Sequence, residues 1–348
     1  MNGKNLWLIF LLLPAAWLAG CSSYKSTDSP AASLAPTLMV WTVAGKPGVP
    51  GSTNGTGSSA LFHTPRGITL DSPGNIYVAD NGNYQIRKIS PVGVVSTLAG
   101  LGTQGSANGP GTIASFNSPI GLAADPSGNI YVADQGSGLI REITPGGMVS
   151  TLAGGGPGTA TNAVGILASF AGPAGVALDA SGNLYVADTF NDLIRKIAPG
   201  GMVSTVAGQV GIQGSTNGAV SIATFAWPCS VAVDGSGNLY VGEWINDDIR
   251  KITPAGQVSP LAGFFSPITG IALDHSGNVY AADSIYGLVR KVSGSGVVST
   301  FAGSGAVGFA NGSVTSADFN NDQGIALDTS GNVYVADSNN DLIRRIGF

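Results

Sequence analysis

Short apolar runs, separated by Gly, Pro, Ser and Asn, recur along most of this chain at a nearly constant spacing. The clearest run is Gly-Asn, a branched aliphatic residue, Tyr, and then Val-Ala-Asp or a close variant. It is present six times: Gly74–Asp80, Gly128–Asp134, Gly182–Asp188, Gly237–Glu243, Gly277–Asp283 and Gly331–Asp337. Successive Gly-Asn pairs are 54, 54, 55, 40 and 54 residues apart. A period of this size indicates a repeat architecture in which each unit packs on its neighbours.

Each unit contains four apolar runs, which predict four strands joined by tight turns. In the third unit they are Gly175–Asp179, the Gly182–Asp188 run, Leu193–Ile197 and Met202–Gly208. A single four-stranded unit has two apolar faces and cannot bury both by itself. Six such units closing in a ring predict an all-β fold, a six-bladed β-propeller of four-stranded blades.

The two ends of the repeat region are complementary. Met39–Gly45 matches the fourth strand of a unit, but no first three strands precede it. The sixth unit ends at Phe348, directly after its third strand. We therefore expect the N-terminal strand to complete the last blade and close the ring, which leaves no free sheet edge there.

Long loops join the fourth strand of one unit to the first strand of the next. One Phe recurs in them and is expected to anchor the loop in the core: Phe62, Phe116, Phe170, Phe225 and Phe319. The loop between the fourth and fifth units is reduced to Ala262–Gly270, which accounts for the spacing of 40 residues.

The composition leaves few ionisable side chains for chemistry. Charged residues are 10% of the chain and the net charge is −5, which gives no basic footprint for nucleic acid. Of the 20 acidic residues, 12 end the first or second strand of a unit, and an Arg follows each second-strand acid after seven residues. These Asp–Arg pairs are interpreted as structural, contributing about 0–1 kcal/mol each if exposed and more if buried.

The first 37 residues predict an export signal and a tether. Lys4, an apolar run Leu6–Leu18 and Leu18-Ala19-Gly20-Cys21 have the layout of a secretory signal, too short to span a membrane. Residues 1–20 are therefore expected to be a signal peptide, 21–37 a flexible tether rich in Ser, Ala and Pro, and 38–348 the propeller. The tetrapeptide ending at Cys21 resembles the lipobox of bacterial lipoproteins. That resemblance implies lipidation of Cys21 and a lipid-anchored, exported protein of the bacterial cell envelope.

The repeating unit resembles the NHL repeat in all six copies. The resemblance rests on Pro-x-Gly before the first strand, Gly-Asn-Leu-Tyr-Val-Ala-Asp, Leu-Ile-Arg-Lys-Ile and Val-Ser-Thr-Leu-Ala-Gly. The family's characteristic histidine is replaced, in order, by Tyr84, Gly138, Asp192, Asp247, Gly287 and Asp341. The resemblance implies a propeller that binds proteins or other macromolecules; related propellers of the lactonase or lyase type use a metal in the central channel.

A metal site receives limited support from the residues. The six aspartates that end the first strands could converge on the channel floor as a Ca²⁺ site, but each is also placed to cap its own turn. The chain has two histidines, His63 and His275, with no spacing relation between them. Cys229 has no His or Lys near it in the sequence and is interpreted as an inert thiol. We therefore expect no cofactor, with a channel Ca²⁺ and the metal-dependent lactonase or lyase kept as alternatives.

The departures from the repeat indicate a binding site. The residue that precedes the Gly of the first strand should ring the channel mouth on the long-loop face, and it varies among units, with Arg66 in the first. Aromatic residues gather around the shortened loop, where a notch is expected in the rim. The candidate binding residues for a protein, peptide or glycan ligand are Trp244, Tyr286, Glu243, Trp227, Phe264, Phe265 and Arg66. An inward packing of Phe264 and Phe265 is the alternative for those two.

Overall fold

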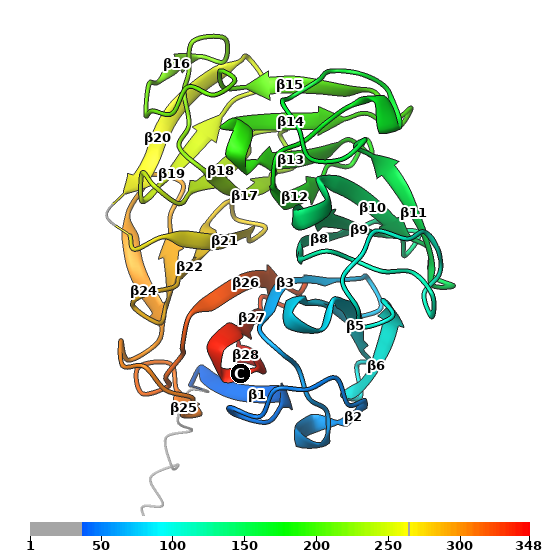
Figure 1. Cartoon of the computed structure of the whole chain (residues 1–348). Helices are drawn as coiled ribbons and strands as arrows, with labels where there is room; N and C mark the ends of the chain where they lie inside the picture. The colour runs from blue at the N-terminus through cyan, green and yellow to red at the C-terminus, as the bar shows by residue number, and fades with distance from the viewer. Residues whose placement is uncertain (1–36, 264) are drawn as a thin grey trace, which may run out of the picture. The chain divides into compact units, whose positions relative to one another are not determined.

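The computed structural model describes residues 37–263 and 265–348. Residues 1–36, with Cys21, the expected signal peptide and most of the expected tether, and Phe264 lie outside the described residues. Residues Thr37–Phe348 form one compact unit. Within it six antiparallel sheets are arranged radially around one axis, as the sequence predicts (Figure 1). No helix of the described residues is long and apolar enough to cross a membrane.

The strands of each blade follow one another from the axis outwards. Blade 1 contains β3 (Pro65–Leu70), β4 (Ile76–Asp80), β5 (Gln85–Ile89) and β6 (Val94–Ala99). Blade 2 contains β8 (Pro119–Ala124), β9 (Ile130–Asp134), β10 (Leu139–Ile143) and β11 (Met148–Ala153). Blade 3 contains β12 (Pro173–Leu178), β13 (Leu184–Asp188), β14 (Leu193–Ile197) and β15 (Val203–Ala207).

The second half of the ring repeats this order. Blade 4 contains β17 (Pro228–Val233), β18 (Leu239–Glu243), β19 (Asp248–Ile252) and β20 (Gln257–Gly263). Blade 5 contains β21 (Ile268–Leu273), β22 (Val279–Asp283), β23 (Leu288–Val292) and β24 (Val298–Ala302). Blade 6 contains β26 (Asp322–Leu327), β27 (Val333–Asp337), β28 (Leu342–Gly347) and β1 (Met39–Gly45).

The long loops add short elements that the sequence pattern does not predict. Two-residue strands extend the outer edge of four blades: β2 (Gly55–Thr56), β7 (Gly109–Pro110), β16 (Gly218–Ala219) and β25 (Gly312–Ser313). The long loops also contain two single 3₁₀ turns, η1 (Gly57–Ser59) and η4 (Gly165–Leu167). Four more 3₁₀ turns connect the second and third strands of a blade: η2 (Asn81–Asn83), η3 (Gln135–Ser137), η5 (Thr189–Asn191) and η6 (Ser338–Asn340). The short strands cover edges that would otherwise present unpaired backbone groups.

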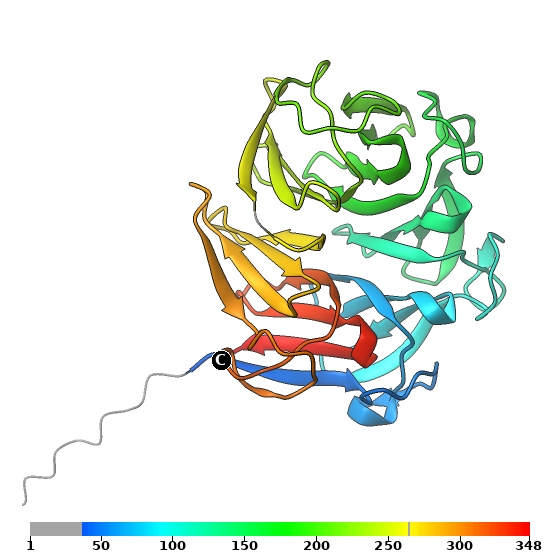
Figure 2. The same cartoon turned by 60° about the vertical axis from the view of Figure 1, so that its left-hand side comes forward.

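The ring is closed by β1, which confirms the predicted closure. It pairs antiparallel with β28, Met39 opposite Gly347 and Val40 opposite Ile346, and lies beside it in both views (Figures 1 and 2). Val40 and Ala44 are fully buried against residues of blades 5, 6 and 1. The first and last segments of the repeat region are thus parts of one sheet.

The repeated Arg–acid pairs are buried, so they are more than exposed register contacts. In blade 3, Arg195 donates to Asp188, to the carbonyl oxygens of Ser169 and Thr161 and to Asn162, and its guanidinium lies 5.3 Å from the centre of the Phe170 ring. Blades 1, 2, 4 and 6 repeat this arrangement with the other four loop phenylalanines. The arginine therefore ties the long loop to the blade, and the expected anchoring role of the phenylalanines is confirmed by their complete burial.

Blade 5 lacks this long loop, and its arginine shows the consequence. Arg290 bonds Asp283 and Thr300 and is 22% exposed, because no loop carbonyls cover it. Phe265 lies three residues before the first strand, as the loop phenylalanines do, and is 6% exposed in the apolar core. Phe265 therefore packs inward, which is the alternative to a binding role that the sequence leaves open for it.

Candidate functional site

The first strands of the six blades surround the axis of the ring and bring their backbones into close contact. A Cβ atom on Gly67 would lie 1.8 Å from the carbonyl oxygen of Ile120, and one on Gly324 would lie 2.1 Å from that of Arg66. Glycine is therefore required at these positions by the approach of neighbouring strands. Blade 4 has Ser230 at the equivalent position.

The residue before each of these positions reaches the channel mouth, as the sequence pattern predicts. In every blade the register between first and second strand shifts at this point, for example between Pro65 and Ile68, so the first strand is bulged. A bulge redirects the side chain of the extra residue. We call the six residues the mouth ring: Arg66, Ile120, Ala174, Cys229, Thr269 and Gln323.

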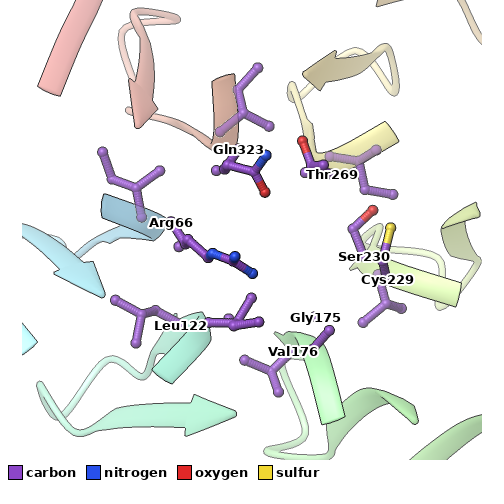
Figure 3. A pocket seen from close by; sticks show the side chains of 18 residues that line it. Arg66, Leu122, Gly175, Val176, Cys229, Ser230, Thr269 and Gln323 are labelled. Carbon is purple, nitrogen blue, oxygen red and sulfur yellow. The ribbon is translucent and has the colours of Figure 1, made fainter. Parts of the chain in front are cut away.

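Two cavities share the six residues of the mouth ring. Below it, a cavity of about 70 Å³ follows the axis and is lined by the inner apolar ring of Ile68, Leu122, Val176, Val231, Ile271 and Ile325 (Figure 3). Above it, a cavity of about 170 Å³ opens at the mouth. The upper cavity is bounded by the mouth ring together with Gln135, Thr189, Phe190, Trp227 and Trp244.

Three aromatic side chains form one wall of the upper cavity. Phe190 and Trp227 meet edge to face, with ring centroids 5.5 Å apart. The Trp244 backbone N–H donates to the Trp227 carbonyl at 3.0 Å. Phe190 is 53% exposed and Trp244 39% exposed, so both rings present surface to solvent. The wall is confined to blades 3 and 4, which breaks the six-fold repetition of the mouth.

Trp227 is held in an unusual backbone conformation. Its φ is +52°, a left-handed value that is uncommon for a bulky residue. The carboxylate of Asp192, from blade 3, accepts the Trp227 backbone N–H at 3.0 Å. Asp192 occupies one of the positions where the family's histidine is replaced, so this departure has a structural use between blades. The equivalent residues of blades 1, 2, 3 and 6 also have positive φ, so this conformation belongs to the repeat: Thr64, Ser118, Gly172 and Asn321.

The candidate residues named from the sequence do not all meet at this site. Arg66, Trp227 and Trp244 line the upper cavity together. Glu243 is fully buried and accepts hydrogen bonds from Arg250 and Asn246, so it faces the core and is not a polar partner at the surface. Phe265 is also a core residue. Tyr286 is 54% exposed but does not line either cavity.

Phe190 was not named from the sequence, although a signal for it exists. It occupies the middle position of the connection between the second and third strands, where blades 1 and 2 have Gly82 and Gly136. This departure from the repeat lies in blade 3, away from the shortened loop around which the sequence predicts the site.

Arg66 carries the charge of the site. Of the described residues that line the two cavities, Arg66 alone is charged at neutral pH. Burial lowers the pKa of its guanidinium, with no neighbouring carboxylate to oppose that effect among the described residues. The guanidinium points toward the channel axis (Figure 3).

Cys229 is not an activated thiol. Its Sγ donates to the Ile268 carbonyl oxygen, and burial raises the pKa of the thiol to about 12. A cysteine nucleophile needs a lowered pKa, so this residue contributes surface to the mouth rather than chemistry.

The aspartates that end the first strands are engaged in their own turns. Asp179, for example, accepts from the backbone N–H groups of Ser181 and Asn183, from the Asn183 side chain and from the Tyr185 hydroxyl. Those hydrogen bonds outweigh its burial and lower the pKa of Asp179. Within residues 37–263 and 265–348, no group of three or more His, Cys, Asp or Glu side chains could hold a metal ion. The channel side chains do not fit a Ca²⁺ ion or a catalytic metal.

Comparison with known proteins agrees with this architecture. The family model for the NHL repeat matches residues 62–89, 116–142 and 170–196, which lie in blades 1 to 3. The chain is a β-propeller, and these three segments match the NHL repeat. Human NHL repeat-containing protein 2 is 28% identical over 240 residues, covering 59% of this chain and 33% of that protein. The chloroplastic protein SUPPRESSOR OF QUENCHING 1 of Arabidopsis thaliana is 36% identical over 94 residues, 27% of this chain and 9% of that protein. This propeller therefore spans a third or less of the length of these curated relatives.

Solved structures resemble it in fold. An auxiliary nutrient binding protein from Bacteroides thetaiotaomicron superposes with a TM-score of 0.66 at 14% identity, covering 89% of this chain and 76% of that one. A streptogramin B lyase superposes with a TM-score of 0.58 at 14% identity, covering 89% of this chain and 98% of the lyase chain. At these identities the likeness shows the shared propeller fold and nothing about a shared reaction.

Proposed function

We propose that this NHL propeller is a binding module whose ligand enters the channel mouth on the long-loop face. The observation that supports it is the aromatic wall of Phe190, Trp227 and Trp244 beside the 170 Å³ upper cavity. Aromatic residues next to a concavity supply large apolar contact area, and Trp and Tyr are enriched at binding hot spots. The ligand is a peptide, a protein segment or a glycan that inserts one group into the mouth.

A catalytic role receives less support from the channel. Lactonase- and lyase-type propellers resemble one another in using channel metal ligands, whereas the inner ring here consists of apolar residues and the mouth offers Arg66, Thr269, Gln323 and a protonated Cys229. A resemblance to a lyase in fold does not supply the missing carboxylate and imidazole groups.

Binding can be tested with the segment Thr37–Phe348, which contains all six blades and the strand that closes them. A glycan array and a tripeptide library would be probed with this segment and with Trp244→Ala and Phe190→Ala variants. Each substitution is expected to weaken binding of the ligands found by about 5- to 30-fold, since removal of an aromatic side chain from a binding interface costs about 1–2 kcal/mol. The melting temperature should change little, because both rings are partly exposed.

Tyr286→Ala is the matched control, because it removes an equally exposed aromatic ring outside the cavity. Affinity lost in the Tyr286 variant and retained in the other two would place the site at the shortened loop, as the sequence first suggested. A segment that binds no member of either panel would contradict the proposed function.

We further propose that the propeller is exported and attached by lipid at Cys21 to the bacterial cell envelope. This rests on the sequence of the signal region, because Cys21 lies outside the described residues. Two or three acyl chains would hold the protein firmly at about 0.8 kcal/mol per buried CH₂. Cells expressing the full chain should incorporate labelled palmitate, and Cys21→Ser should abolish both labelling and membrane retention. Retained labelling in the variant would refute the anchor.

A further inference from the structure

The arginine at the channel mouth lacks the partners that the other buried arginines have. Arg87, Arg141, Arg195, Arg250, Arg290 and Arg344 each form a salt bridge with the acid that ends a second strand. Arg345 donates to Asn332 and lies over the Trp41 ring. Over the described residues, Arg66 takes part in no salt bridge and its side chain has no hydrogen-bond acceptor.

The fold does not need a cation at this position. The other members of the mouth ring are Ile120, Ala174, Cys229, Thr269 and Gln323, and their blades have the same bulged first strand. Arg66 is half-buried, and partial burial of a charge is unfavourable unless an opposite charge or acceptors compensate for it. An arginine that has no partner here among the described residues therefore points to an anion supplied from outside.

The surroundings of Arg66 are polar on one side and apolar on the other. Thr269 donates its hydroxyl to the Asp322 carbonyl oxygen at 2.9 Å, and Gln323 donates to the Asn321 side chain at 2.7 Å. These hydrogen bonds fix the orientation of both side chains, which line the upper cavity together with Arg66. Figure 3 shows Gln323 and Thr269 next to each other on one side of the channel. Across the upper cavity lies the aromatic wall of blades 3 and 4.

We propose that the mouth binds a carboxylate carried on an apolar ring or side chain. The carboxylate pairs with the Arg66 fork, and the apolar group lies against Trp227, Trp244 and Phe190. A planar guanidinium matches a carboxylate in a bidentate pair. One cation suits a monoanion, and the upper cavity is smaller than a pocket for a drug-sized ligand, so it accepts one or two rings or one terminal residue. This inference rests on the proposed function and specifies the chemistry of its ligand.

The same chemistry has two sources, a free aromatic carboxylic acid and the C-terminal residue of a peptide. The test therefore uses two matched pairs of probes: 2-naphthoate with 2-naphthamide, and the dipeptide Ala-Trp with its C-terminal amide. Affinities for the Thr37–Phe348 segment would be measured by isothermal titration calorimetry. We expect the carboxylate member of at least one pair to bind about 10- to 100-fold more tightly than its neutral partner, the range of a charge-assisted bidentate pair.

Arg66→Gln tests the assignment to this residue. Glutamine already occupies the mouth ring in blade 6, so the variant is expected to fold. It should reduce the ratio of carboxylate to amide affinity to about one while it leaves the affinity for the neutral probe nearly unchanged. Lys46→Gln is the control, because it removes the same charge from an exposed residue outside both cavities.

Each outcome is decisive. A carboxylate preference in the naphthyl pair alone supports a free aromatic acid as the ligand. A carboxylate preference in the dipeptide pair alone supports a peptide C-terminus. Equal affinity for carboxylate and amide in both pairs overturns the inference, as does a preference that survives Arg66→Gln or falls equally with Lys46→Gln. If no probe binds but array ligands bind in a Trp244-dependent manner, the carboxylate inference fails and the proposed function stands. If neither the probes nor the arrays bind, both fail.

Discussion

Removal of one buried arginine should destabilise the propeller far more than a surface ion pair could. Arg195→Met deletes hydrogen bonds to Asp188, to two loop carbonyls and to Asn162, and leaves the carboxylate of Asp188 buried without a cation. Both side chains are fully buried, and the pair is 2.9 Å apart. Breaking such a pair from one side costs about 3–5 kcal/mol. That is a large part of the roughly 5–15 kcal/mol by which folded proteins are stable.

Blade 5 provides the matched control. Arg290→Met removes the same side chain where the long loop is missing, and Arg290 is 22% exposed with bonds to Asp283 and Thr300. Asp283 is itself fully buried, but no long loop covers this end of the blade, so removal of the partly exposed arginine admits water to the carboxylate and we expect a loss of roughly 1–2 kcal/mol. The difference in free energy of unfolding between the two variants therefore measures how much the long loop adds to the stabilising effect of the buried arginine.

The assay is urea unfolding of the Thr37–Phe348 segment, followed by circular dichroism. A double variant, Arg195→Met with Asp188→Asn, identifies the cause. If the uncompensated carboxylate dominates, the neutral amide should restore a good part of the lost stability. Equal losses for Arg195→Met and Arg290→Met, or no recovery in the double variant, would refute the reasoning.

Three further changes test other parts of the structure. Deletion of Met39–Gly45 should lower the free energy of unfolding by several kcal/mol and yield oligomers on size-exclusion chromatography, because it exposes the β28 edge and the apolar face that β1 covers. A deletion variant that stays monodisperse and equally stable would exclude closure by this strand. Asp322→Ile should raise the free energy of unfolding at pH 7 by about 1–3 kcal/mol. The buried carboxyl of Asp322 has no partner for either oxygen among the described residues, and burial raises its pKa well above the usual value. A lower melting temperature in the variant would show that the fold needs this carboxyl. Burial raises the pKa of Asp248 to about 6; the positive charge of Arg250 opposes this shift, and the negative charge of Asp247 adds to it. Between about pH 4 and pH 6 the folded state therefore keeps a proton that the unfolded state releases. The contribution of Asp248 to the free energy of unfolding is fully present below about pH 4 and is lost as the pH rises through about 6, a decrease of about 1–2 kcal/mol after solvent screening. Asp248→Asn should flatten that part of the pH–stability curve, and an unchanged slope would assign it to other groups.

The six-fold repetition made the fold predictable. Alternating apolar runs, Gly-Asn turns and the unmatched strand Met39–Gly45 are local signals, and each is restated or completed elsewhere in the chain. The turn role of the first-strand aspartates was also correctly favoured, because an Asp before Gly-Asn has backbone donors within reach whatever the rest of the fold does.

The candidate site was predictable only in part, because it depends on which blades meet across the mouth. The mouth ring followed from its repeated position, and Trp227 and Trp244 from their departure from the pattern. Phe190 joins them only through the contact of blades 3 and 4. Glu243 was misplaced at the surface, although its position seven residues before Arg250 matches the buried pairs of the other blades.

The sequence by itself determined the number of blades and their strand order, because these depend on patterns that lie within single units, and it determined the closure of the ring, because the strand missing from the last unit precedes the first. Only the tertiary structure decided that the repeated arginines are buried, since the long loops must fold over each blade to cover them. It also decided that Arg66, at the mouth, has no partner for its side chain among the residues that the structure describes. The solvation and neighbours of a charge are set by segments distant in the chain, and no local pattern records them.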